Sequence, residues 1–183
     1  PGSGGGVGID PAAVDNAGQG GVWNHLRTYP ADGTYVNAGG FVYRTAGGAP
    51  IYLSSFSAIP GSGGGVGIDP AAVDNAGRGD PWNHLRTYPA DGTYINAGGN
   101  VYRFAGGAPT YLSSFGAIAG SEGGTAIDPA ALDNAGAGNV WNHIRTYPAD
   151  GTLLQAGPGG VMYRTTSGIP LIAAGSDSQG SVV

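Results

Sequence analysis

The sequence predicts a mainly β protein with short helices, built from three tandem units of 59 residues. The string WNHLRTYPADGT begins at Trp23 and again at Trp82, and it returns as WNHIRTYPADGT at Trp141. Thirty-eight glycines and 13 prolines separate short runs rich in tyrosine, valine and isoleucine, which is how turns separate packed strands. A fixed spacing of this length is typical of a repeat protein.

The repeat divides the chain into units 1–59, 60–118 and 119–183. The first two units differ at only eight positions, which are 19, 21, 22, 36, 41, 45, 51 and 57 in the first. The third is degenerate: it has a two-residue insertion near Gly157, and Ile172 and Ser176 replace Tyr52 and Phe56. Loss of aromatic side chains at the last strand is expected of a terminal unit with no following neighbour.

Each unit is expected to begin with two short helical segments. Asp10 is suited to cap the first helix, Pro11 to occupy its first position and Gly18 to end it. The second segment contains Trp23 and is expected to end at Pro30; in the second unit, Asp80–Pro81 predicts an N-cap and a first-turn proline for it.

Three short strands are then expected, at 34–38, 41–46 and 50–56 in the first unit, joined by Gly-Gly pairs that suit tight turns. One three-stranded antiparallel meander has open edges and an uncovered face, so it is not expected to be stable alone. The units should therefore pack either as a repeat array or as a pseudo-threefold ring, propeller-like or trefoil-like.

The composition excludes several classes of function. The chain has no cysteine and no lysine, so disulfides and thiolate metal sites are absent. A net charge of -5 without a basic cluster argues against nucleic acid and anionic membranes, and no apolar run is long enough to insert in a bilayer. No signal peptide is visible, but the chain starts in mid-repeat, so a targeting segment would lie outside it.

The recurring tryptophan, histidine and first aspartate of each unit are predicted to be structural. A histidine beside a tryptophan on a short helix most often hydrogen-bonds a backbone carbonyl. The alternative is a metal bound by three imidazoles on a threefold axis. The predicted structural residues are Trp23, Trp82, Trp141, His25, His84, His143, Asp10, Asp69 and Asp128.

The aspartate that ends the first helix has two interpretations. Asp15, Asp74 and Asp133 are weak calcium candidates, although their spacing is neither that of an EF-hand nor that of a glycine-aspartate calcium repeat. The favoured interpretation is that Asp15 forms an ion pair with Arg44 or Arg27 and ties helix to sheet. No other metal and no cofactor is predicted.

Enzyme activity is not expected. Ser54 and Ser55 with His25 and Asp32 are the only candidates for a nucleophile, a base and an orienting acid, and no sharp strand-to-helix turn presents the serines. The third unit has Ala174 and Gly175 in their place.

The strings VYR.AGGAP.Y at Val42 to Tyr52 and HL....PADGT at His25 to Thr34 resemble tandem repeats of secreted actinobacterial proteins. Such repeats stand beside cell-wall or polysaccharide hydrolases, and the resemblance extends over all three units. It implies an extracellular or cell-surface location and an accessory role in binding carbohydrate or the cell envelope.

Two functions are therefore considered. The first is a non-catalytic adhesion module that binds polysaccharide or cell-wall glycan, in which tyrosines provide flat faces for sugar rings and repeated weak sites gain by multivalency. Its candidate ligand-binding residues are Tyr35, Tyr52, Tyr94, Tyr111, Arg44, Arg103 and Arg164. The alternative is a structural, self-assembling repeat protein, a spacer or a filament or ring subunit whose partners are further copies of itself.

Overall fold

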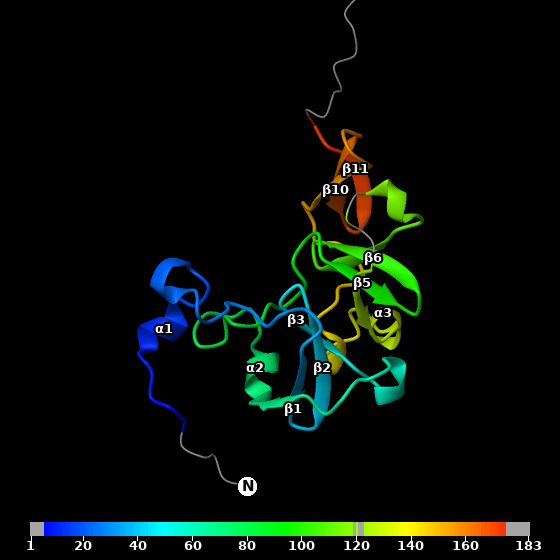
Figure 1. The fold of residues 1–183 in the computed structure, drawn as a ribbon. Coiled ribbons are helices and arrows are strands. Elements are labelled where there is room, and N and C mark those ends of the chain that lie inside the picture. Colours follow the sequence, from blue (N-terminus) through cyan, green and yellow to red (C-terminus); the bar gives the residue numbers. More distant parts are fainter. Residues whose placement is uncertain (1–5, 119, 121–122, 175–183) are drawn as a thin grey trace, which may run out of the picture.

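The computed structural model describes residues 6–118, 120 and 123–174. It is mainly β, with few short helices and three sheets of three or four strands. Within these residues none of the sheets closes into a barrel, and α1 and β11 lie at opposite ends of the molecule (Figure 1). Of the two arrangements expected, a repeat array or a ring, the ring is therefore not seen among the described residues. Ser176 lies outside them.

The helical segments are shorter than the sequence predicts. They are α1 (Pro11–Asp15), η1 (Gly21–Trp23), η2 (Phe56–Ala58), α2 (Pro70–Asp74), η3 (Phe115–Ala117), α3 (Ala130–Asp133) and η4 (Asn139–Trp141). The predicted caps are correct, since the carboxylates of Asp10 and Asp69 accept from Ala12 N and Ala71 N at 3.0 and 2.9 Å. Gly18 follows α1 with φ 78°.

The prediction of a second helix in the second unit is wrong. Between α2 and β5 the described chain contains only turns around Trp82. Asp80 accepts from the side chain of Asn83 rather than from a backbone N–H, and a single bond from Trp82 N to Gly79 O closes one turn. One turn does not propagate, because helix nucleation is costly.

The strands form three antiparallel meanders, as predicted. The first contains β1 (Tyr35–Ala38), β2 (Phe41–Ala46) and β3 (Ala49–Tyr52); the second contains β5 (Tyr94–Ala97), β6 (Asn100–Ala105) and β7 (Ala108–Tyr111); the third contains β9 (Leu153–Gln155), β10 (Met162–Thr166) and β11 (Ile169–Ile172). Gly47 and Gly48 join β2 to β3 with φ 56° and 81°. Positive φ at both central residues is what a tight hairpin of this hand requires.

Two of the three sheets each contain a fourth strand that the sequence did not indicate. Strand β4 (Val66–Ile68) lies parallel to β1, with Val36 opposite Val66. Strand β8 (Thr125–Ile127) lies parallel to β5, with Ile95 opposite Thr125. Both come from the glycine-rich start of the following sequence unit, so we call β4 and β8 the donated strands. The sheets are consequently offset from the boundaries at 59/60 and 118/119.

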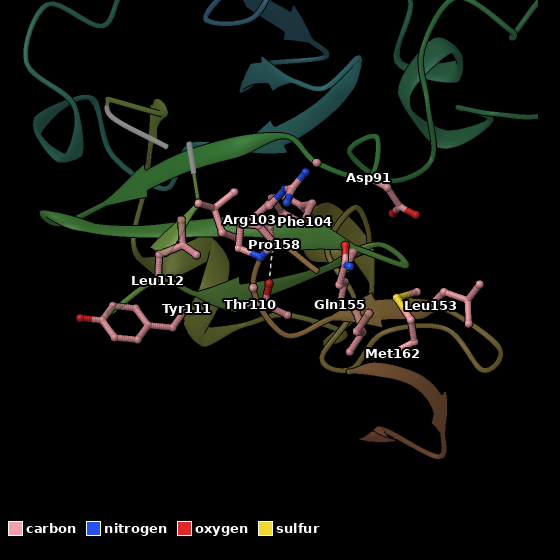
Figure 2. Close-up of a pocket in the computed structure, with 15 residues that line it drawn as sticks. Asp91, Arg103, Phe104, Thr110, Tyr111, Leu112, Leu153, Gln155, Pro158 and Met162 are labelled. Carbon is pink, nitrogen blue, oxygen red and sulfur yellow. Dashed lines mark hydrogen bonds between the residues drawn. The ribbon is translucent and has the colours of Figure 1, made fainter. Parts of the chain in front are cut away.

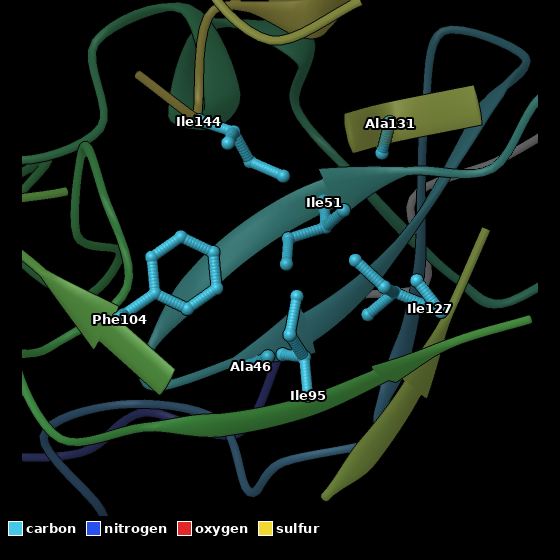
Figure 3. Close-up of a cluster of buried hydrophobic side chains, with 8 residues drawn as sticks. Ala46, Ile51, Ile95, Phe104, Ile127, Ala131 and Ile144 are labelled. Carbon is cyan, nitrogen blue, oxygen red and sulfur yellow. The ribbon is translucent and has the colours of Figure 1, made fainter. Parts of the chain in front are cut away.

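The main core lies between the first and second sheets. Ile51 on β3 faces Ile95 and Phe104 of the second sheet, and Ile127 from the donated strand β8 completes the contact (Figure 3). Phe104 is 1% exposed. Residues from all three sequence units therefore share one apolar cluster, with α3 and Ile144 closing it.

Candidate functional site

The predicted histidines contact the preceding sequence unit. His84 Nδ1 lies 3.0 Å from Thr28 O, and His143 Nδ1 lies 2.9 Å from Thr87 O. Because a carbonyl only accepts, Nδ1 carries the proton in each ring. His25, the counterpart in the first unit, is exposed. His84 and His143 thus each have a hydrogen bond to a backbone carbonyl of the kind expected, whereas the structural role predicted for His25 stays a prediction.

The arginine that follows each histidine stacks on a tyrosine of the preceding unit. The guanidinium carbon of Arg86 lies 4.4 Å from the Tyr29 ring centroid, and Arg145 lies 4.4 Å from that of Tyr88. This is the geometry of a cation–π contact. The sequence analysis did not identify these pairs, because 57 residues separate the two members of each pair and no local spacing relates them.

Among the predicted ligand-binding arginines, Arg44 is occupied by contacts within the protein. Its Nη1 donates to Ala126 O at 2.7 Å, and its guanidinium stacks on Tyr35 at 5.1 Å. Arg103 stacks on Tyr94 at 5.4 Å in the same way. Arg164 is exposed, and its Nη1 donates to Gly151 O at 3.4 Å.

The candidate tyrosines differ in their surroundings. Tyr52 is partly buried, and its ring meets the Trp141 ring edge-on at 4.8 Å between centroids. Tyr111, the counterpart in the second unit, is 59% exposed. Trp23 and Trp82 are partly buried. Of the four candidate tyrosines, Tyr111 is therefore the most accessible to a ligand.

Asp128 connects the first and third sequence units. Its Oδ2 accepts from Ser54 N at 2.7 Å and from Ser54 Oγ at 2.5 Å, while its Oδ1 caps α3 through Ala130 N at 2.9 Å. Asp128 is 4% exposed. Because Ser54 Oγ is bound to this carboxylate, the structure does not assemble Ser54 with His25 and Asp32. Asp32 instead accepts from Gly47 N at 2.8 Å.

The expected ion pair of Asp15 with Arg44 or Arg27 is not found among the described residues, and that prediction is wrong. Arg44 instead donates to Gly33 O and Ala126 O and stacks on the Tyr35 ring. No group of three or more His, Asp or Glu side chains that could hold a metal ion occurs in the described part of the chain, including around Asp15, Asp74 and Asp133.

Burial changes the pKa values of His143 and Tyr43, whose rings meet between the first and third units. The pKa of His143 is lowered from 6.5, chiefly because the ring is desolvated by burial, against the opposing effects of the Thr87 carbonyl and Asp74. Burial, and then the negative charge of Asp74, raises the pKa of Tyr43 to about 12. Both groups are therefore neutral near pH 7 and suited to a packed contact rather than to proton transfer.

A hollow of about 770 Å³ lies beside β6, β7 and β9 (Figure 2). Arg103, Thr110 and Tyr111 line one side, and Leu153, Gln155 and Met162 line the other. Apolar side chains and a few polar groups thus converge on an open surface, as in many ligand sites. This hollow is the candidate functional site.

No known protein family, curated protein or solved structure matches this chain. The resemblance to secreted actinobacterial repeats therefore stays a prediction. Within the described residues, no helix is long and apolar enough to cross a membrane.

Proposed function

We propose that the chain is a non-catalytic structural repeat protein in which each unit is held by the units before it. The observation that carries this proposal is the pair of donated strands, because β4 and β8 each extend the sheet of the preceding unit in the same parallel register. Such nearest-neighbour contacts make the stability of a repeat array a property of the whole stack. The resemblance favours an extracellular or cell-surface setting for it.

Two further kinds of side-chain contact hold the sequence units together. Each later histidine and arginine binds the unit before it, through Thr28 and Tyr29 or through Thr87 and Tyr88. In addition, Ser54 of the first unit binds Asp128 of the third. An open array, rather than a ring, accounts for the separation of α1 and β11 (Figure 1).

A comparison of Asp128→Ala with Asp69→Ala tests this proposal. Both substitutions remove a helix cap, which costs about 1 kcal/mol, but only Asp128 also binds Ser54. We expect Asp128→Ala to lower the free energy of urea unfolding by roughly 2 kcal/mol more than Asp69→Ala, because it also removes the two hydrogen bonds from Ser54 to a buried carboxylate.

The double variants provide the control for this comparison. Combining Ser54→Ala with Asp128→Ala should give a coupling energy of about 1 kcal/mol. The same cycle at Ser113 and Asp69, which are not bonded to each other, should give none. Equal losses for both aspartates and no coupling at Ser54 would refute the interlocked array.

A second candidate function is binding of carbohydrate or cell-wall glycan at the hollow, favoured by the exposed Tyr111 at its edge, whose ring meets that of Tyr102 edge-on at 5.6 Å between centroids. Isothermal titration with peptidoglycan fragments and arabinogalactan tests it. If a glycan stacks on this ring, Tyr111→Ala should abolish the heat of binding, whereas Tyr147→Ala, at an exposed tyrosine outside the hollow, should retain it. Absence of heat with every glycan would contradict this candidate.

A further inference from the structure

The two ends of the described array carry complementary unfilled positions. Among the described residues, β9 pairs with β10 on one side only, whereas its counterparts β1 and β5 each carry a donated strand on the other side. At the opposite end, Val7–Ile9 has the same sequence as β4 but pairs with no strand in the part of the chain that the structure describes, and Val7 and Ile9 are 91% and 58% exposed.

We propose that a second copy of this chain docks head to tail, so that its residues Val7–Ile9 become the fourth strand beside β9. This inference rests on the proposed repeat array. The register follows from the two pairings within the chain: Val7 of the second copy lies opposite Leu154, Gly8 opposite Gln155 and Ile9 opposite Ala156. Addition of a strand to an open sheet edge is a common mode of protein recognition.

The hollow lies where the side chains of a docked Val7–Ile9 segment would pack. Beside the first sheet, the corresponding space is filled by Ile127 of β8 and Ala131 of α3, which are each 2% exposed. Ile9 and Ala13 occupy the same repeat positions as Ile127 and Ala131. A docked second copy therefore fills the hollow with the side chains that fill its counterpart.

Polar groups at the edge of the hollow also match. Arg44 donates to Ala126 O, and Ser54 donates to Asp128. Their counterparts, Arg103 and Ser113, face the position where Gly8 O and Asp10 of a second copy would lie. The Asp10 side chain is exposed in the single chain, so its free carboxylate oxygen is accessible to Ser113.

The same docking would also repeat the arginine–tyrosine and histidine–carbonyl contacts that join successive units within the chain. Tyr147 is 65% exposed, while its counterparts Tyr29 and Tyr88 are each covered by an arginine of the next unit. At the other end, Arg27 is exposed. Docking places Arg27 of the second copy over Tyr147, and it places His25 beside Thr146 O.

Glycine substitutions at the docking strand provide the test. A Cβ atom at Gly65 would lie 2.8 Å from the Val36 backbone, and one at Gly124 would lie 2.7 Å from Ile95 N. At Gly6, the counterpart in the first unit, nothing lies within 4 Å. Gly6→Val should therefore leave the single chain unchanged and clash only when Val7–Ile9 docks against β9.

Sedimentation velocity from micromolar to millimolar concentration measures the association. The unmodified chain should show a mass above 18.0 kDa that rises with concentration, and Gly6→Val should stay monomeric with an unchanged unfolding midpoint. Gly8→Ala is the matched control. It should associate like the unmodified chain, because nothing lies within 4 Å of a Cβ at Gly67 and the third unit already has Ala126 at this position.

Cross-linking identifies which surfaces meet. The chain has no cysteine, so oxidation of a mixture of Asp10→Cys and Ser113→Cys chains should give a mixed disulfide dimer, whereas a mixture of Asp69→Cys and Ser113→Cys chains should give far less. An 18 kDa monomer at all concentrations without the mixed dimer would overturn the proposal. Saturation of the hollow by a glycan in a chain that never associates would also overturn it. Neither outcome would refute the array within one chain, because the comparison of Asp128→Ala with Asp69→Ala tests that array independently.

Discussion

At the scale of single residues, equivalent side chains of the repeat have different surroundings. His25 is exposed, His84 is partly buried and His143 is 4% exposed. The sequence around the three histidines is nearly the same, so the difference arises from how many preceding units cover each ring. The burial that results lowers the pKa of His143.

This lowered pKa predicts a loss of stability in mild acid. The unfolded chain binds a proton at His143 below pH 6.5, whereas the buried ring in the folded chain resists protonation until a lower pH. The free energy of unfolding should therefore fall as the pH decreases from 6.5 toward the pKa of His143 in the folded chain. Below that pKa, His143 should cause no further loss of stability.

Urea unfolding at pH 7 and pH 5 measures the effect. His143→Gln should reduce the difference between the two pH values, and His25→Gln, at the exposed counterpart, should leave it unchanged. At pH 7, loss of the bond to Thr87 O should cost His143→Gln about 1 kcal/mol. An identical pH dependence in both variants would contradict the role of His143 burial.

At the scale of elements, the donated strands depend on glycine. Gly65 precedes β4 with φ 70° and lies against the backbone of β1. A strand preceded by a residue with a side chain could not approach so closely. The glycine-rich stretch, which looks like a flexible linker by composition, is therefore a requirement for strand pairing.

Gly65→Ala and Gly61→Ala form a matched pair that tests this requirement. Both glycines have positive φ, 70° and 77°, so both substitutions cost about 1 kcal/mol from backbone conformation. Only at Gly65 does the new Cβ meet backbone, at 2.8 Å from the Val36 carbonyl carbon. We expect Gly65→Ala to lower the free energy of urea unfolding by roughly 2 kcal/mol more than Gly61→Ala.

Hydrogen exchange of the β1 amides gives an independent measurement. Exchange should accelerate in Gly65→Ala, because β4 leaves the edge of β1, and should remain slow in Gly61→Ala. Equal effects of the two substitutions would show that the close approach of β4 does not matter for stability.

At the scale of the whole molecule, exposure increases from the first sheet to the third. Strand β3 is almost entirely buried, β7 is partly exposed and all four residues of β11 are exposed. Strand β3 is covered by η4 of the third unit, whereas no later unit covers β11 among the described residues. This gradient explains why the hollow lies at the β9 end, which is where we propose that a second copy docks.

Much of the local structure was predictable from the sequence. The caps at Asp10 and Asp69, the three meanders and the Gly-Gly hairpins depend on residues within a few positions of each other, so their signals lie in short strings. The second helix in the second unit was predicted wrongly from the same kind of signal. Asp80 and Pro81 satisfy the local rule for a helix start, but the rule does not say whether enough backbone bonds follow.

What the sequence alone determined is the mainly β class, the 59-residue period and the residues that recur in it. The tertiary structure decided which units those residues join. His143 binds Thr87 across 56 positions, and Ser54 binds Asp128 across 74. The physical reason is that the donated strands place each unit on the sheet of the one before it, which brings together side chains that no local spacing relates.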